Sequence, residues 1–348
     1  MSAVTHNSPV SLPRRNALNS LIRGATILSG AGAGVYSGQS MAAAKIALRI
    51  STPAVPDDWH AKMWTVFKDS LETAAPGAYD AQINLNATLF KQGAEGAAMA
   101  RGNLHMASVS AFDIAKLVPE FSIFTAGYVV RDPAQQQKIF NGPIGAEMFR
   151  RVSEKMDITL LSTAYLGTRQ LTLRDTRKVM TPADLRGVKL RMPSSKEWLF
   201  LGAALGATPT PLAFGEVYMG LGNGTIDGQD NPLPTVRAAK LYEVSRQIIL
   251  TGHLIDSLFI AISNRTLASL SPAQQQQVRT AAMAAANYNN ENRLKEEGQL
   301  VGFFRQQGLQ VNTPDVNAFR KSVLAAYQNS DYGRDWPQGL LERINAVK

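Results

Sequence analysis

The 348-residue sequence contains no cysteine, which excludes disulfide bonds, thiolate metal sites and cysteine nucleophiles. Without cysteine the chain fits a reducing compartment and an oxidising compartment equally well. Histidine is also scarce, with only His6, His60, His105 and His253. None of them forms a His-x-x-x-His pattern or stands beside a second candidate ligand, so the sequence predicts no metal site. We expect no other cofactor either.

Long apolar runs and catalytic motifs are missing too. No run of about 18 uncharged apolar residues is present, so we expect no insertion into a membrane. The 36 basic residues outnumber the 27 acidic ones, but they are scattered, and nucleic-acid binding requires a clustered basic face. A Gly-x-Ser-x-Gly elbow and a Walker loop are absent, and the glycine-rich "GLGNGTIDG" lacks the dinucleotide-binding spacing. These absences weigh against nucleic-acid binding and against catalysis.

Residues 1–44 differ from the rest of the chain because they contain arginines but no acid. The pair Arg14–Arg15 precedes a weakly apolar stretch of small residues, and an Ala-x-Ala site ends at Ala44. This order is typical of an export signal, and paired arginines indicate the twin-arginine route, although Ala17 fits that motif poorly. We therefore expect cleavage after Ala44 and a mature protein in the periplasm, with the formal net charge lowered from +9 to +6 by loss of three arginines.

The mature part alternates between strand and helix patterns. Strands are predicted at 45–52, 79–85 and 104–110, with amphipathic helical spacing between them. This alternation indicates an α/β protein with mainly parallel sheets. Residues 272–307 have one proline, at the start, and predict a long helix that crosses two domains; the alternative is two helices broken near Gly298.

The segment "VKLRMPSS" places Arg191 at the end of a predicted buried strand. Pro193 cannot donate to a sheet ladder, so the strand ends there and its last side chains can face a cleft. A guanidinium in this position serves either an internal ion pair or an anion from outside the protein. Trp59 lies on the first turn after the first strand, where ligands often bind, but it also fits a core position.

Four further segments identify a family resemblance. The stretches "AYLGTRQLT", "LRGVKLRMPSS", "GATPTPLAFGEVYMGLGNGTIDGQDNPL" and "YEVSRQIILTGH" occur in an order and spacing similar to those of the extracytoplasmic solute receptors of TRAP transporters, the tripartite ATP-independent periplasmic importers. The resemblance covers about residues 45–325. It implies a two-domain periplasmic-binding-protein-like fold, with a ligand cleft between the domains and a long helix that spans both. The expected domains are 45–166 plus 257–296, and 167–256 plus 297–348.

The resemblance also implies roles for individual residues. Arg191 would grip the ligand carboxylate, Asn231 would donate its amide to that carboxylate, and Arg169 would be a second cation or a structural partner. Phe214 would pack on the ligand or in the core. Ser110 and Ser194 would shape the space for the ligand's far end. Because both serines are small and neutral, we expect a compact acid of four to six carbons rather than a nine-carbon amino sugar.

The resulting hypothesis is a receptor and not an enzyme. It would bind a C4-dicarboxylate or a sugar acid as a monomer and deliver it to the membrane permease subunits of a TRAP transporter. One alternative is a periplasmic carboxylate receptor for another importer or a sensor, which would use the same residues. A less favoured alternative is an exported hydrolase or isomerase, which would need a titratable base that the sequence does not show.

Overall fold

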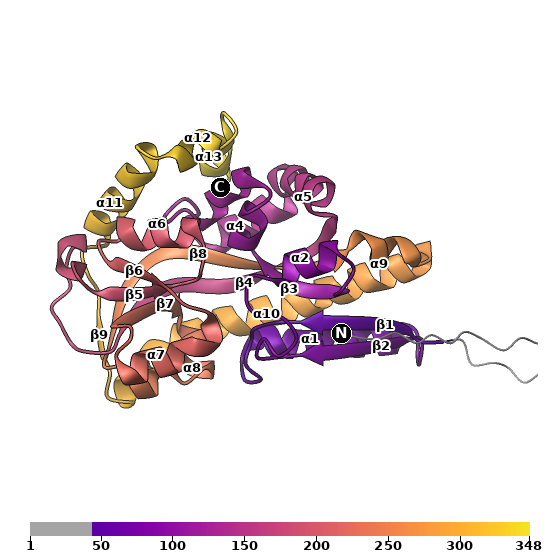
Figure 1. Cartoon of the computed structure of the whole chain (residues 1–348), viewed down its shortest axis with the longest axis horizontal. Coiled ribbons are helices and arrows are strands. Elements are labelled where there is room, and N and C mark those ends of the chain that lie inside the picture. Colours follow the sequence, from indigo (N-terminus) through magenta and orange to yellow (C-terminus); the bar gives the residue numbers. More distant parts are fainter. Residues whose placement is uncertain (1–43) are drawn as a thin grey trace, which may run out of the picture. The chain divides into compact units, whose positions relative to one another are not determined.

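The computed structural model describes residues 44–348, so the predicted export signal lies outside the described residues except for Ala44. Helices and strands alternate through most of this part (Figure 1). The strands are β1 (Ile46–Ser51), β2 (Tyr79–Asn84), β3 (Met106–Ser110), β4 (Ile158–Leu173), β5 (Lys189–Met192), β6 (Thr208–Pro211), β7 (Gly228–Pro232), β8 (Gln247–Ser263) and β9 (Gln310–Asn312). The α/β class predicted from the sequence is confirmed.

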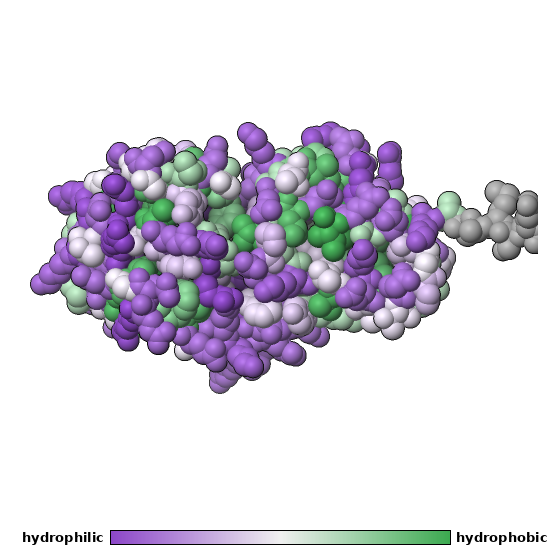
Figure 2. Space-filling view, turned by 90° about the horizontal axis from the view of Figure 1, so that it is seen from below, coloured by the Kyte–Doolittle hydropathy of each residue, from purple (hydrophilic) through white to green (hydrophobic). Residues whose placement is uncertain are grey.

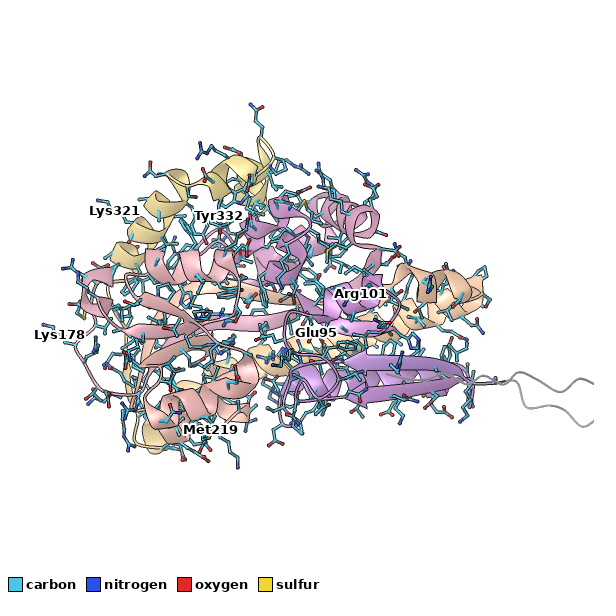
Figure 3. The ribbon with its side chains drawn as sticks, in the orientation of Figure 1. Glu95, Arg101, Lys178, Met219, Lys321 and Tyr332 are labelled. Carbon is cyan, nitrogen blue, oxygen red and sulfur yellow. The ribbon has the colours of Figure 1, made fainter. Side chains whose placement is uncertain are left out.

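The helices fall between and after these strands. They are α1 (Trp59–Ala74), α2 (Glu95–Ala100), α3 (Ala111–Ala115), α4 (Pro133–Asn141), α5 (Pro143–Met156), α6 (Lys196–Ala204), α7 (Val217–Asn223), α8 (Leu233–Ala238), α9 (Asn264–Ser269), α10 (Pro272–Gln306), α11 (Val316–Gln328), α12 (Asp331–Asp335) and α13 (Leu340–Ala346). Short 3₁₀ segments are η1 (Pro119–Thr125), η2 (Pro182–Leu185), η3 (Phe214–Glu216) and η4 (Leu241–Val244). Glu95 and Arg101, both labelled in Figure 3, mark the start of α2 and the residue after its end.

The described strands join one mixed sheet in the order β2-β1-β3-β8-β4-β7-β5-β6, with β9 paired to β8. Parallel pairing holds for β1 with β2 and β3, for β5 with β6 and β7, and for β8 with β9. At the centre, however, β8 runs antiparallel to β3 and β4, and β4 runs antiparallel to β7. The expectation of mainly parallel sheets was therefore wrong for the centre, where β4 and β8 run side by side along their length (Figure 1).

The long helix is continuous. α10 contains 35 residues, which corresponds to about 52 Å at about 1.5 Å per residue. Ser271 caps its first turn, and its side chain and that of Gln274 form a reciprocal capping box. Because the helix continues through Gly298, the alternative of two helices broken there was wrong.

α10 contributes to two separate hydrophobic clusters. Its first half packs with β1 and α1 through residues such as Val278 and Ala282. Its last turns place Leu300 and Phe304 in a cluster with α7 and α8. A third, larger cluster combines side chains from both predicted domains, including Phe121 and Trp198. The helix thus joins two cores as expected, while the domain boundaries given by the sequence remain a prediction.

Hydrophilic side chains cover most of the face seen in Figure 2, and hydrophobic residues occur there in separate patches. Among residues 44–348, no helix combines the length and the apolar character that crossing a membrane requires.

Candidate functional site

A cleft lies beside the ends of several strands. Segments that follow β1, β3 and β5 contribute to its lining, as do β4, β7 and β8. The carboxyl ends of strands are where α/β sheets commonly bind ligands. The lining residues are Thr52, Pro53, Ala54, Asp58, His60, Gln92, Ser110, Phe112, Leu166, Arg169, Arg191, Pro193, Trp198, Phe214, Asn231, Thr235, Asp256 and Leu258.

Arg191, on β5, lines this cleft with only 1% of its surface exposed. Its Nε donates to the carbonyl of Leu212 at 2.8 Å, and its Nη2 donates to Gln92 Oε1 at 3.2 Å. Within residues 44–348, no carboxylate forms an ion pair with it and Nη1 has no hydrogen-bond acceptor. Burial lowers the pKa of Arg191 to about 9, with the Asp230 carboxylate partly offsetting this effect. The group thus stays cationic at neutral pH while lacking a counter-charge.

Arg169, on β4, lines the same cleft but is neutralised by two acids. Its Nε donates to Asp230 Oδ2 at 2.7 Å, and its Nη1 donates to Asp256 Oδ2 at 2.8 Å. Its Nη2 donates to the carbonyl of Asp230 and to Asn231 Oδ1. The guanidinium also stacks on Trp198, with Cζ 4.3 Å from the ring centre. These contacts fit the structural role that was one of the two predicted for Arg169, and a ligand contact by this residue stays a prediction.

The two acids have opposite pKa shifts. Burial alone would raise the pKa of Asp230, but Arg169 and His253 outweigh it and hold the pKa well below its usual range. For Asp256, burial dominates and raises the pKa despite the ion pair with Arg169. Burial likewise works to lower the pKa of Arg169, yet the two carboxylates keep it above its ordinary value. The network is therefore a buried structural unit beside the cleft.

Asn231 and Phe214, two of the residues predicted for the binding site, also line the cleft. Asn231 Nδ2 donates to Gln229 Oε1 at 2.5 Å, which leaves its second N–H for another acceptor. Phe214 opens η3, and its backbone N–H donates to Gln92 Oε1 at 3.1 Å. Gln92, from the loop before α2, thus accepts hydrogen bonds from both Arg191 and the backbone of Phe214.

A second charged network lies along the first turn of α1. Asp58 Oδ1 accepts from Arg293 Nη2 at 2.5 Å, and Asp58 Oδ2 accepts from Thr235 Oγ1 at 3.1 Å. Arg293, from the middle of α10, also donates to the carbonyl of Leu166 at 2.5 Å. Burial works to raise the pKa of Asp58, but Arg293 and His60 outweigh it and hold the pKa well below its usual range. Asp58 thus stays ionised and paired.

Five of the seven predicted binding residues meet at the cleft: Arg191, Arg169, Asn231, Phe214 and Ser110. Ser110 ends β3, and its hydroxyl donates to Asp113 Oδ2 at 3.3 Å. Being on the cleft does not by itself assign a ligand contact, so these roles remain predictions.

Ser194 and Trp59 do not line the cleft. Ser194 is exposed between Pro193, which does line it, and Ser195, which caps α6. Trp59 turns toward α10 instead, where its Nε1 donates to Glu296 Oε2 at 2.5 Å and its ring packs on Tyr288. The cleft lining thus does not include either residue, and a ligand contact by Ser194 or Trp59 stays a prediction.

Sequence reasoning missed several lining residues, among them Asp58, His60, Gln92, Thr235 and Asp256. For Asp58 and His60 a signal existed, because both flank Trp59 in the turn that the sequence marked as a ligand position. For the other three, only the pairing of distant segments reveals their position. Within residues 44–348, no three histidine or acidic side chains are grouped as a metal ion would require.

The comparison with known proteins identifies the family. The family described as "Bacterial extracellular solute-binding protein, family 7" matches residues 51–332. The chain belongs to this family. Its members are solute-binding proteins of TRAP transporters, and they act in transport rather than as enzymes. The family and the class of function predicted from the sequence are thereby confirmed.

Individual relatives of this TRAP solute-binding protein have different named ligands. The sialic acid-binding periplasmic protein SiaP of Vibrio cholerae is 31% identical over 62% of this chain and 66% of its own length, just under two thirds. The 2,3-diketo-L-gulonate-binding periplasmic protein YiaO of Escherichia coli is 28% identical over 91% of this chain and 96% of its own length. A third relative is a TRAP periplasmic solute-binding protein from Roseobacter denitrificans, whose crystal structure contains bound 3-deoxy-D-manno-oct-2-ulosonic acid. Its sequence is 45% identical, the match covers 88% of this chain and 100% of that chain, and the TM-score is 0.84.

Proposed function

We propose that this TRAP solute-binding protein binds a hydroxylated acid with a single carboxylate, and that Arg191 holds that carboxylate. The observation that carries the proposal is the buried Arg191 guanidinium without an acidic partner among the described residues. A buried cation is costly unless a hydrogen-bonded anion pairs with it. A ligand carboxylate supplies such an anion, and the planar guanidinium matches it with two parallel bonds.

The charged side chains of the cleft favour a ligand with one carboxylate rather than two. Arg169 is paired with Asp230 and Asp256, and Arg293 is paired with Asp58. Asp58 and Asp256 also line the cleft and would repel a second ligand carboxylate. Of the two choices that the sequence left open, these acids favour a sugar acid over a C4-dicarboxylate.

Neutral polar groups on the lining suit the rest of such a ligand. The hydroxyl protons of Ser110 and Thr235 go to Asp113 and Asp58, so these oxygens can accept hydrogen bonds from ligand hydroxyls, and Asn231 has a free N–H to donate. Phe214 and Trp198 provide apolar surface for the carbon chain. The ligands named for SiaP, YiaO and the Roseobacter protein are likewise acids that carry hydroxyl groups. This likeness supports the ligand class.

Ligand capture would involve closure of two lobes with the predicted boundaries. In the ladder between β4 and β8, a register shift lies between Tyr165 and Gly167, and Gly167 faces Asp256. Gly167 has φ +130°, and a Cβ there would lie 2.4 Å from Pro232 Cβ, so the position requires glycine. The boundaries at 166/167 and 256/257 thus face each other at one irregular point, which is suited to act as a hinge.

The closed receptor would then deliver its ligand to the TRAP permease, and it would bind acids without converting them. It would act in the periplasm as a monomer. Incubation of the protein with bound acids, followed by proton NMR of the small molecules, should show no product. A new product at catalytic turnover would contradict the receptor role.

The export proposal predicts the N-terminus of the mature protein. We expect material from the periplasmic fraction to begin at or near Lys45, because the Ala-x-Ala site ends at Ala44. N-terminal sequencing of that fraction measures this directly. A chain that keeps Met1 and stays in the cytoplasmic fraction would contradict both export and the periplasmic role.

A thermal-shift screen tests the ligand class. The panel should contain D-erythronate, D-galactonate, D-glucuronate, 3-deoxy-D-manno-oct-2-ulosonate, sialic acid, succinate and malate. A ligand at about 100 times its dissociation constant should add about 2.7 kcal/mol to the free energy of unfolding. We expect hydroxylated monocarboxylates to stabilise the protein most, with compounds of four to six carbons ahead of sialic acid. A response to succinate alone would contradict the single-carboxylate proposal.

A further inference from the structure

His60 is a buried, partly unpartnered imidazole on the cleft. It lies on the first turn of α1, lines the cleft with only 5% of its surface exposed, and has a buried ring nitrogen, Nε2, without a hydrogen-bond partner among the described residues. Unpartnered polar atoms are rare in protein interiors. The network of Arg293 and Asp58 accounts for the other ring nitrogen, Nδ1, and not for Nε2.

The neighbours of Nδ1 determine where the ring proton lies. Nδ1 is 2.9 Å from the ionised Asp58 Oδ1, a distance that requires a proton between the two atoms. Arg293 Nη2 is also 3.3 Å from Nδ1, but its two N–H groups are already directed to Asp58 Oδ1 at 2.5 Å and Thr235 Oγ1 at 3.0 Å. The tautomer is therefore Nδ1–H, and Nε2 carries a lone pair.

Burial keeps the ring of His60 neutral, and the two charged groups beside it act in opposite directions. Asp58 favours protonation, whereas Arg293 from α10 opposes it, and both are in direct contact with the ring. Burial is the largest influence and lowers the pKa of His60, with Asp58 partly offsetting it. At neutral pH, Nε2 can therefore accept a hydrogen bond but cannot donate one.

We propose that His60 Nε2 accepts a hydrogen bond from a ligand hydroxyl, and that this contact makes the receptor select polyhydroxy monocarboxylates over dicarboxylates of the same length. The inference rests on the proposed function, since it concerns the same cleft. A hydroxyl has a proton to donate to Nε2. An ionised carboxylate has none, and it would meet both the Nε2 lone pair and the charge of Asp58.

Matched ligand pairs give the sharpest test. D-Galactonate and galactarate differ only at the far end, which is a hydroxymethyl group in the first and a carboxylate in the second; D-erythronate and meso-tartrate form the corresponding four-carbon pair. Calorimetry at pH 7.5 should show each aldonate binding at least about tenfold more tightly than its dicarboxylate, in line with the loss of a hydrogen bond and an unpaired polar group. His60→Leu should weaken aldonate binding by roughly tenfold and reduce this preference.

A second measurement does not depend on how His60→Leu folds. In the intact protein labelled with ¹⁵N-histidine, the signals of His60 should show a protonated Nδ1 and an unprotonated Nε2, with the assignment made from His60→Gln. Addition of D-galactonate or D-erythronate should shift the Nε2 signal in the direction of an accepted hydrogen bond. His105→Gln is the matched control, since His105 does not line the cleft and its Nδ1 accepts from the backbone N–H of Arg49; it should keep the affinity unchanged.

Different outcomes separate the two proposals. If no acid of either class binds, the proposed function fails, and this inference fails with it. If aldonates bind but leave the Nε2 signal unchanged, or if the dicarboxylate of each pair binds as tightly, the role of His60 is overturned while the receptor function stands.

Discussion

Replacement of Arg191 by methionine is expected to abolish ligand binding without destabilising the ligand-free protein. Arg191 is buried and lacks a counter-charge among the described residues, so the uncharged side chain removes a desolvation cost. The variant also removes the proposed carboxylate partner, and affinity should fall by roughly a hundredfold or more, since charge-assisted hydrogen bonds contribute about 1.5–3 kcal/mol each. Calorimetry with the best acid of the screen and urea unfolding of the free protein measure the two effects.

Arg191→Lys separates charge from geometry. Lysine keeps the positive charge but cannot form two parallel bonds to a carboxylate, so affinity should fall by roughly tenfold to a hundredfold. Arg150→Met is the control, because Arg150 is an exposed residue of α5 that forms an ion pair with Glu154 in the next turn. An unchanged affinity in Arg191→Lys, or a free Arg191→Met protein that loses several kcal/mol, would show that Arg191 is a structural residue.

Replacement of Arg169 by methionine should have the opposite signature, a large loss of stability. Asp230 and Asp256 would both remain buried without their guanidinium partner. Breaking a buried pair in this way costs about 3–5 kcal/mol of unfolding free energy. We expect this loss in urea unfolding at pH 7.5.

The pH dependence of that loss has a definite sign. In the original protein, the lowered pKa of Asp230 gives stability that is present above its unfolded pKa and is lost as the pH falls. In Arg169→Met, the unpaired acids should have raised pKa values, so protonation at low pH relieves the strain. The difference between the two proteins should therefore shrink from pH 7.5 to pH 5.

Matched variants complete this test. Arg150→Met should cost less than about 0.5 kcal/mol, as is usual for exposed ion pairs. Adding Asp230→Asn to Arg169→Met should recover part of the loss by removing one buried charge. A cost in Arg169→Met no larger than that in Arg150→Met would contradict the structural role of this network.

Much of the local structure could be predicted because its causes are local. Asp58 caps α1 by accepting from the backbone of His60, and Ser271 caps α10 with Gln274. These contacts join residues two or three positions apart, so the sequence contains both partners in order. The same holds for Arg191, since Pro193 ends β5 just beyond it.

The centre of the sheet could not be predicted in this way. β4 and β8 pair over most of their length although they are far apart in the sequence. Arg169 on β4 and Asp256 on β8, for example, form a side-chain hydrogen bond across nearly ninety positions. Alternation of strands and helices indicates an α/β class, but it does not specify which distant strands become neighbours or in which direction they run.

The candidate site likewise combines features set by short segments with features set by the tertiary structure. The sequence by itself determined that an arginine lies at the end of a buried strand, because this feature depends on a short segment. Only the tertiary structure decided that, among the described residues, Arg191 has no carboxylate partner while Arg169 has two, because the acids come from β7 and β8. It also decided that His60 lines the cleft while Trp59 turns to α10, since neighbouring residues of a helix point about 100° apart and packing fixes which one faces the ligand.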